Sequence, residues 1–284
     1  MVYKYSNTPL LPQFMSDPAV NAMRKEREEQ TVQLTALLRT AAPSIDSASV
    51  RASVTCGTLD VQCKRARAAA NSEYTRLRKE LKEAAAALTY GLPNGGRAAE
   101  ERDAYVAQYG CVAWTSESLE AIASKGKIVE VGAGYGQWAR ALRQVGADVL
   151  AYDDGSSLPS MPSASSSSSD AADGAEATAP PASIEGVTLA VDGAVAAARH
   201  PDRALLMVAP PPGPAANRWL GSYKGSILLY AGEGRGGASA DEAFFEAVER
   251  GWRPVATYAL KPFPGGCEKL WILERQAGFG LAAK

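Results

Sequence analysis

Histidine and cysteine are scarce in this 284-residue chain, which has one His and four Cys. The cysteines, at positions 56, 63, 111 and 267, follow no CxxC spacing, so we expect no zinc or other metal site. Cys56 and Cys63 are the only near pair, and because a bridge between them would matter only in an oxidising compartment, we expect buried free thiols. With His200 as the only imidazole, a Ser/His/Asp or Cys/His nucleophile system has little support.

Long apolar runs are also missing. No stretch approaches 18 consecutive apolar residues, which excludes a transmembrane helix. The first residues, MVYKYSNTPLLPQF, lack the charged start, apolar middle and small-residue cleavage site of a secretory signal, and they carry no arginine for a transit peptide. We therefore expect an intracellular protein, cytoplasmic by default, with an organelle such as the mitochondrion as the alternative.

Neither sign of charge is in excess, since 30 Lys and Arg face 31 Asp and Glu. Residues 1–110 carry 15 basic and 12 acidic side chains, so a basic arm is not hidden there. These numbers give no electrostatic footprint for nucleic acid, which we do not expect as a partner. The 46% of hydrophobic residues excludes a wholly disordered chain, and the length fits one globular domain with an appendage or two small domains.

Residues 1–110 predict a helical N-terminal extension. Apolar residues recur near helical spacing over 17–39, and a second stretch rich in Ala, Lys, Arg and Glu covers 59–90. Shorter helices are expected over about 97–108 and 115–126. The charged second helix is interpreted as a solvated surface, with a surface that docks a protein partner as the alternative.

The pattern changes to alternating strands and helices in residues 111–276. KIVEVGAGYG predicts a strand that runs into glycines, QWARALRQVG a helix and ADVLAYDD a second strand, which together form a βαβ unit. Further strands are expected in VTLAVDG, RALLMVAPPP and SILLYAGEG, and WRPVATYALKPF and CEKLWILER predict a final pair joined by PGG. This order indicates an α/β sheet flanked by helices.

Residues 155–182 interrupt this pattern. The segment contains no aromatic residue, no Lys and no Arg, and it is dominated by Ser, Ala and Pro. Such a composition cannot bury a core, so we predict a disordered insertion, passive in function, with a lid over the site as the alternative. Residues 277–284 are expected to form a tail.

The glycine-rich turn after the first predicted strand is the clearest functional signal. Gly132, Gly134 and Gly136 follow a strand and open a helix, so their backbone can approach a ligand closely. The NAD-type fingerprint needs GxGxxG, yet position 137 is Gln, and the Gly-Lys-Ser/Thr of a phosphate-binding P-loop is absent. The remaining match is the glycine pattern of S-adenosylmethionine methyltransferases, with Glu130 two positions before the first glycine. A tight turn with no ligand is the alternative.

The segment from Ile128 to Arg140, with the strand that ends at Asp153, resembles class I methyltransferases of the seven-stranded Rossmann-like type. Residues 105–275 look like a group of uncharacterised methyltransferase-like proteins. The resemblance implies a Rossmann-like, mostly parallel sheet with an antiparallel final strand. It also implies S-adenosylmethionine as the cofactor, bound by Glu130, Gly132, Ala133, Gly134, Tyr135, Gly136, Asp153 and Asp192.

Within that implied site, the glycine loop lines the amino-acid portion of the cofactor. Asp153 accepts hydrogen bonds from the ribose hydroxyls, and Asp192 matches the position near the adenine amino group. A helix or turn cap is the alternative role for Asp153, and the adjacent Asp154 is an alternative for the ribose contact. Trp114, Trp138 and Trp219 wall a pocket or, as large aromatics in α/β proteins more often do, belong to the core.

Methyl transfer from a sulfonium needs alignment and exclusion of water more than it needs a base. The acceptor is expected at the carboxyl ends of the strands, where Ala209 to Pro212 emerge. Enzymes of this class that methylate exocyclic amines carry Asp, Asn or Ser before Pro-Pro and an aromatic after it, so Ala209 and Pro212 argue against a nucleobase amine. The candidate catalytic residues are Pro210 and Pro211, whose carbonyls would hold an acceptor, and Glu233, which orients or deprotonates a substrate or caps the following turn.

Two functions therefore stand. One is an S-adenosylmethionine-dependent methyltransferase of unknown acceptor. The other is a non-catalytic, methyltransferase-like structural subunit of a larger protein assembly, in an organelle or in the cytosol, docked through the helices of residues 1–110. A third reading, an RNA-modifying or RNA-binding protein, is weakened by the charge balance.

Overall fold

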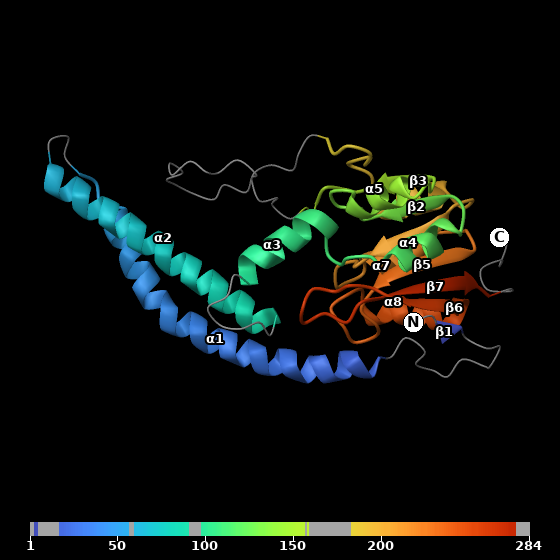
Figure 1. The fold of residues 1–284 in the computed structure, drawn as a ribbon, viewed down its shortest axis with the longest axis horizontal. Coiled ribbons are helices and arrows are strands. Elements are labelled where there is room, and N and C mark those ends of the chain that lie inside the picture. Colours follow the sequence, from blue (N-terminus) through green and yellow to red (C-terminus); the bar gives the residue numbers. More distant parts are fainter. Residues whose placement is uncertain are drawn as a thin grey trace. The chain divides into compact units, whose positions relative to one another are not determined.

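A computed structural model of the chain describes residues 3–4, 17–56, 60–90, 98–156, 158 and 183–276. It divides into two compact units (Figure 1), one of residues 22–102 and one that joins the chain up to Asn21 to residues 103–284. The predicted α/β class with a helical N-terminal region is confirmed. The predicted insertion lies outside the described residues apart from 155, 156 and 158, and so does the predicted tail.

The helical unit is built from long helices, and its first helix is longer than the sequence predicted. α1 covers Pro18–Ala52, α2 covers Val61–Tyr90, and α3, Ala98–Tyr109, begins in this unit. The apolar spacing ends near residue 39, but an Ala-rich tract continues α1 past the internal Pro43, because alanine has the highest helix propensity. None of the helices in the described ranges is both long and apolar enough to cross a membrane.

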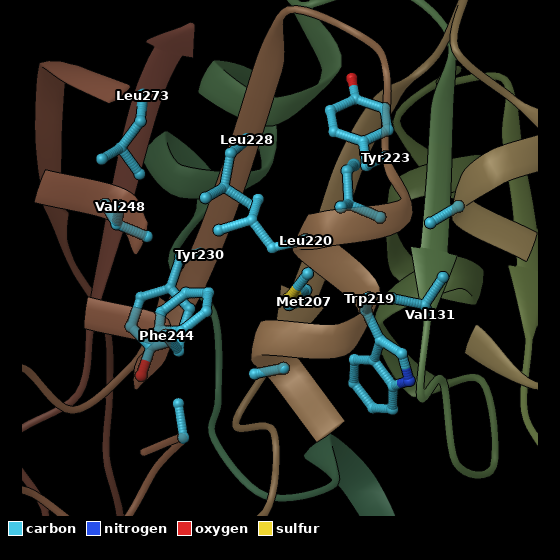
Figure 2. Packing of buried hydrophobic residues seen from close by; sticks show 14 of the residues in the cluster. Val131, Met207, Trp219, Leu220, Tyr223, Leu228, Tyr230, Phe244, Val248 and Leu273 are labelled. Carbon is cyan, nitrogen blue, oxygen red and sulfur yellow. The ribbon is translucent and has the colours of Figure 1, made fainter. Parts of the chain in front are cut away.

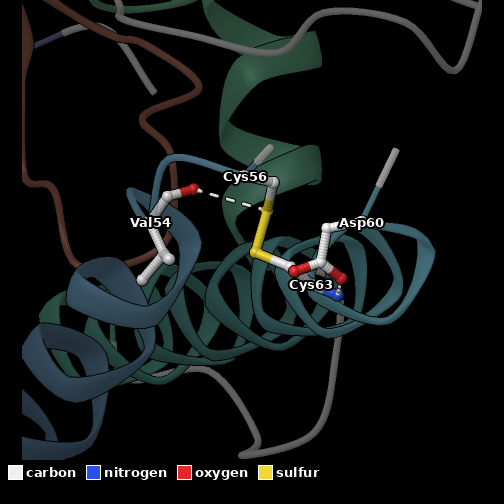
Figure 3. The surroundings of a disulfide bond; sticks show 4 residues. All are labelled: Val54, Cys56, Asp60 and Cys63. Carbon is white, nitrogen blue, oxygen red and sulfur yellow. Dashed lines mark hydrogen bonds between the residues drawn. A yellow bond between two sulfur atoms is a disulfide. The ribbon is translucent and has the colours of Figure 1, made fainter. Parts of the chain in front are cut away.

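A disulfide joins Cys56 to Cys63 between α1 and α2 (Figure 3). The two Cα atoms lie 5.6 Å apart, within the range that a disulfide spans, and the Asp60 carboxylate accepts the Cys63 amide at the start of α2. The expectation of buried free thiols is therefore wrong for this pair. For Cys111 and Cys267, which form no disulfide among the described residues, the expected burial is wrong, since Cys111 is exposed and Cys267 is partly exposed.

The α/β unit is organised around one mixed sheet with the strand order β1-β6-β7-β5-β4-β2-β3. Figure 1 shows this sheet, with every strand except β4 labelled. The strands β3, β2, β4 and β5 are parallel, whereas β7 runs antiparallel to both β5 and β6, between which it lies. The predicted final pair is confirmed as β6 and β7. The strands are β1 Tyr3–Lys4, β2 Ile128–Val131, β3 Val149–Tyr152, β4 Ala204–Val208, β5 Ile227–Gly232, β6 Trp252–Ala259 and β7 Lys269–Arg275.

Helices cover both faces of the sheet, because the central strands are apolar on both sides. Alternate residues such as Val131 and Met207 pack with α6, α7 and α8 in the cluster shown in Figure 2, while Ile128 and Leu206 pack with α4 and α5. The helices of the first face are α6 Gly193–Arg199, α7 Ala215–Ser222 and α8 Glu242–Gly251; those of the second are α4 Ser116–Ala123 and α5 Gln137–Gln144.

The strand predicted in VTLAVDG does not form. Val187 and Thr188 make only isolated bridges, the latter with Tyr152 at the end of β3. Ala190 then adopts a left-handed conformation, with φ 58°, which ends the extended run after one pairing. The expectation of a full strand at this place is therefore wrong.

Candidate functional site

The sheet reverses its strand order beside β2. The chain passes from β2 to β3 on one side and then returns to place β4 on the other side. In open α/β sheets, ligands bind outside the carboxyl ends of the strands at such a switch point. The glycine loop 132–136 follows β2 and the proline segment 209–213 follows β4, so both predicted site segments lie at this edge.

All three loop glycines adopt left-handed backbone conformations, with φ of 70° at Gly132, 56° at Gly134 and 71° at Gly136. Two of them approach the protein's own side chains. A Cβ at Gly132 would lie 2.9 Å from Trp219 Cη2, and one at Gly136 would lie 2.6 Å from Val187 Cγ2. Only Gly134 has open space at this position, so it is the loop glycine that a ligand can approach.

The rest of the loop is held by backbone bonds. The Ala133 amide donates to the Tyr152 carbonyl at 3.0 Å, and the Gly136 amide donates to the Ala133 carbonyl at 2.9 Å. Ala133 packs in the cluster on the α4 and α5 face, and Tyr135 is half-buried. The loop is therefore a formed turn that needs no ligand to complete it.

Asp153 connects the end of β3 to the glycine loop. Its Oδ2 accepts the Gly134 amide at 2.8 Å, and its Oδ1 accepts the Gly155 amide at 2.7 Å. The side chain is 9% exposed, and a carboxylate offers about four acceptor sites, so two remain for a ligand. The side chain of Asp154 is bonded to Ser156 instead, since its Oδ1 accepts both the amide and the hydroxyl of that residue. These two hydrogen bonds lower the pKa of Asp154.

Glu130 lies inside the protein. It shares a strand face with Ile128, so its side chain enters the layer between the sheet and α5 and is only 1% exposed. Burial raises its pKa to about 8, against the opposing effects of the Arg143 charge and a hydrogen bond from the Ala139 amide. Among the residues that the structure describes, its Oε2 has no hydrogen-bond partner. The structure thus places Glu130 under the first turn of α5, away from the open edge.

Asp192 caps α6. Its Oδ1 accepts the Ala194 amide at 2.7 Å, and its Oδ2 pairs with Arg218 of α7 at 2.9 Å. The Val191 amide donates to the Asp153 carbonyl at 3.3 Å, so the segments that carry the two predicted acids meet at this edge. Arg218 is a partner that the sequence did not indicate, because it comes from a helix 26 residues further along the chain.

The tryptophans divide between core positions on the two faces. The Trp138 indole N–H donates to the Val112 carbonyl at 2.9 Å, and Trp114 packs edge-on against its ring. Trp219 is 8% exposed and lies against both Gly132 and Gly193, where a Cβ would be 2.6 Å from its Nε1. That Nε1 has no hydrogen-bond partner in the described part of the chain. The core interpretation therefore describes Trp138 and Trp219.

The segment after β4 is tightly folded. Ala209 has a left-handed φ of 41°, and its amide donates to the Ala231 carbonyl at 2.6 Å. The Pro210 carbonyl accepts the Ala240 amide at 3.0 Å, while Pro211 is exposed. A non-glycine residue at positive φ stores about 1–2 kcal/mol of strain, so surrounding bonds must hold this turn in place.

Glu233 is 1% exposed and folds into the turn that follows β5. Its Oε2 accepts the Ala238 amide at 2.6 Å, which is the turn-capping role. Its Oε1 accepts a hydrogen bond from the Cys267 thiol at 3.6 Å, a contact that no local sequence pattern predicts. The Tyr230 hydroxyl donates to the Glu233 carbonyl, and burial, with the charge of Glu233, raises the pKa of Tyr230.

The edge therefore presents acceptor groups rather than a proton-transfer pair. Asp153 and the open side of Gly134 can receive hydroxyl or cationic groups. In the part of the chain that the structure describes, no group of three or more His, Cys, Asp or Glu side chains could hold a metal ion. Comparison of the chain with models of protein families, with curated proteins and with solved structures found no match.

Proposed function

We propose that this chain is a Rossmann-like methyltransferase that binds S-adenosylmethionine at the carboxyl ends of β2 and β3. The proposal rests on the hydrogen bond from the Gly134 amide to the Asp153 carboxylate. Gly134 is also the loop glycine that has open space at the Cβ position. The parallel order β3-β2-β4-β5, with β7 antiparallel between β5 and β6, supports a Rossmann-like identity for the sheet.

The donor and acceptor groups fit this cofactor. S-adenosylmethionine carries ribose hydroxyls and positive charge on its ammonium and sulfonium groups. Asp153 keeps two acceptor sites beyond the Gly134 and Gly155 amides, and its negative charge favours a cationic ligand. Gly134 would lie against the ligand because a side chain there would fill the open space.

The chain's own residues would bind and orient more than they would transfer protons. When bound, the cofactor supplies an electrophilic methyl group. Asp153 would hold the ribose hydroxyls while its bond to Gly134 keeps the glycine loop in place. Glu233 would fix the turn after β5 by accepting the Ala238 amide, so that this turn forms one side of the site for the methyl acceptor. Alignment and exclusion of water would then provide the rate enhancement.

A second candidate function is that of a methyltransferase-like structural subunit. It is favoured by the bonds that the residues predicted to hold the methyl acceptor already make within the protein. The carbonyl of Pro210 and the carboxylate of Glu233, two of the three predicted catalytic groups, already bond to backbone amides. Residues 1–110, which include the helical unit, would then dock a protein partner in a larger assembly. The Cys56–Cys63 disulfide favours an oxidising, organellar compartment over the cytosol for such an assembly.

The deciding experiment is calorimetric titration of the full chain with S-adenosylmethionine and with its demethylated product. The Asp153→Asn variant is expected to weaken binding of both at least tenfold, because a charge-assisted hydrogen bond contributes about 1.5–3 kcal/mol. Asp148→Asn is the matched control, since Asp148 precedes the same strand and pairs with Arg203 at 2.8 Å, away from the glycine loop.

Binding by the wild type that Asp153→Asn loses and Asp148→Asn keeps would support the cofactor site and justify a screen of methyl acceptors. Absence of binding by the wild type would overturn the proposal and leave the structural-subunit function. Equal binding by the wild type and Asp153→Asn would overturn the assignment of Asp153.

A further inference from the structure

The basic side chains of α2 form one continuous exposed surface. All seven are exposed, and those at the two ends, Lys64 and Lys82, are separated by about 27 Å at the 1.5 Å rise per residue of a helix. We call this surface the basic face of α2; it consists of Lys64, Arg65, Arg67, Arg76, Arg78, Lys79 and Lys82.

The three acidic side chains of α2 are bonded to other groups. Glu73 pairs with Arg51 of α1 at 2.7 Å, and Glu83 accepts the Ala99 amide at 3.1 Å. Glu80 pairs with Arg76 at 2.7 Å, which neutralises one edge of the basic face. Lys79 also forms an exposed pair, with Glu100 of α3 at 3.2 Å. Exposed pairs of this kind are weak, and seven basic side chains against three acids leave α2 with a net positive charge.

One row of the basic face contains no acidic residue of α2. Arg67, Arg78 and Lys82 have no acidic residue three or four positions before or after them in α2, and these are the neighbours that touch on a helix surface. Asn71 and Thr75 continue the row between Arg67 and Arg78 at the same spacing. The row thus combines positive charge with neutral hydrogen-bonding groups.

An aromatic ring borders the row. The Arg78 guanidinium lies 5.5 Å from the centre of the Tyr74 ring, and it donates to the Tyr74 hydroxyl at 3.3 Å. An aromatic ring beside a guanidinium plane offers a stacking surface for an unpaired base.

The near-neutral total charge hides this arrangement. Residues 22–102 carry 14 basic and 10 acidic side chains, whereas the rest of the chain carries 16 and 21. Counting over residues 1–110 averages α2 with α1, whose first twelve residues carry three basic and three acidic side chains, and it takes no account of which helix face each charge occupies. For this reason the charge counts did not indicate a binding surface for a polyanion.

We propose that the basic face of α2 binds single-stranded RNA. Phosphates spaced along a strand complement cations spread over about 27 Å, and binding would draw on counterion release. A protein partner would need apolar anchors at the centre of the interface, and a membrane surface would need an apolar helix face. The basic face contains neither, while the Tyr74–Arg78 pair suits unpaired bases.

Fluorescence anisotropy of the full chain with a labelled 20-nucleotide single-stranded RNA, at several salt concentrations, tests this proposal. The test variant is the triple Arg67→Gln, Arg78→Gln and Lys82→Gln, which keeps good helix formers. The control removes the same charge from exposed positions of the α/β unit, with Arg140→Gln, Lys224→Gln and Arg250→Gln. Circular dichroism verifies that both variants keep the helical content of the wild type.

We expect the wild type and the control to bind, with an affinity that falls as salt rises. The test triple should lower the slope of log affinity against log salt by about 2, since each single-strand phosphate contact contributes about 0.7. No salt-dependent binding by the wild type, or equal losses in the two triples, would overturn the proposal. Tighter binding of the same RNA as a duplex, or equal competition by poly-L-glutamate, would overturn the assignment to single-stranded RNA. None of these readouts depends on S-adenosylmethionine.

Discussion

The Trp219 ring lies against Gly132, so close that a Cβ at position 132 would be 2.9 Å from Trp219 Cη2. Gly132 is therefore required by the protein's own packing, whether or not a ligand binds the loop. Gly134, two residues later, has nothing within 4 Å of the corresponding position. One motif thus contains a packing glycine and a glycine that faces open space.

Replacing these glycines should separate the two roles. Both Gly132→Ala and Gly134→Ala place a side chain at positive φ, which costs about 1–2 kcal/mol. Gly132→Ala adds overlap with Trp219, so we expect its free energy of unfolding to fall by about 1–3 kcal/mol more. Urea unfolding measures both variants, and equal losses would contradict the packing role of Gly132.

Two buried indoles give a second test, since only one of them has a hydrogen-bond partner within the described ranges. Trp138→Phe would leave the Val112 carbonyl unpaired, whereas Trp219→Phe would remove a donor that has no partner. Both changes remove similar volume, so we expect Trp138→Phe to destabilise the protein by about 1–3 kcal/mol more than Trp219→Phe. Thermal unfolding measures the difference, and the reverse order would show that the Trp219 N–H is satisfied in solution.

The buried Glu130 carboxyl should make stability depend on pH. Its pKa is about 8 in the folded protein and about 4.5 in the unfolded chain, so the folded state binds the extra proton between these values. The free energy of unfolding should therefore decrease as pH rises from 5 to 8, by up to about 1.4 kcal/mol per pH unit from this group.

The Glu130→Gln variant has no ionisable group at this position, so its free energy of unfolding should depend less on pH. Denaturant unfolding at several pH values between 5 and 8 measures both proteins. We expect the variant to be the more stable of the two at pH 8, and the difference between their free energies of unfolding to decrease towards pH 5. Parallel pH profiles for the two proteins would show that Glu130 ionises normally in the folded state.

Reduction of the Cys56–Cys63 disulfide should act on the helical unit. The bridge closes an eight-residue loop, and loop-closure entropy assigns it about 2.5 kcal/mol. The Cys56→Ser, Cys63→Ser variant should therefore lose helical signal at a lower temperature. Near-ultraviolet signals from tryptophan should stay unchanged, because all five tryptophans lie in residues 103–284. Unchanged melting of the helical signal would show that the bridge contributes nothing.

Local patterns in the sequence predicted most of the elements. The strand, glycine turn and helix around Gly132 could be predicted because apolar periodicity and glycine are local signals, and the same holds for the pair β6 and β7. The predicted strand after the insertion failed because the left-handed turn at Ala190 has no local signature. The length of α1 was missed because apolar spacing ends before the helix does.

The site was less predictable, because its contacts join residues distant in sequence. The proximity of Asp153 to the glycine loop follows from strand order, so it could be anticipated. The Trp219 contacts with Gly132 and Gly193 could not, since they depend on how α7 packs. The inward direction of Glu130 did have a signal, because it shares its strand face with the buried Ile128.

The placement of β7 between β5 and β6 also determines when the sheet can form during synthesis. β6 has no partner in the central sheet until β7, which ends at Arg275, pairs with both neighbours. β1, at the start of the chain, must wait as well, because it pairs with β6. While the ribosome still holds β7, the edge of β5 is unpaired and open to other strands. A nascent chain of this protein therefore needs β7 outside the exit tunnel before β1 can join the sheet through β6.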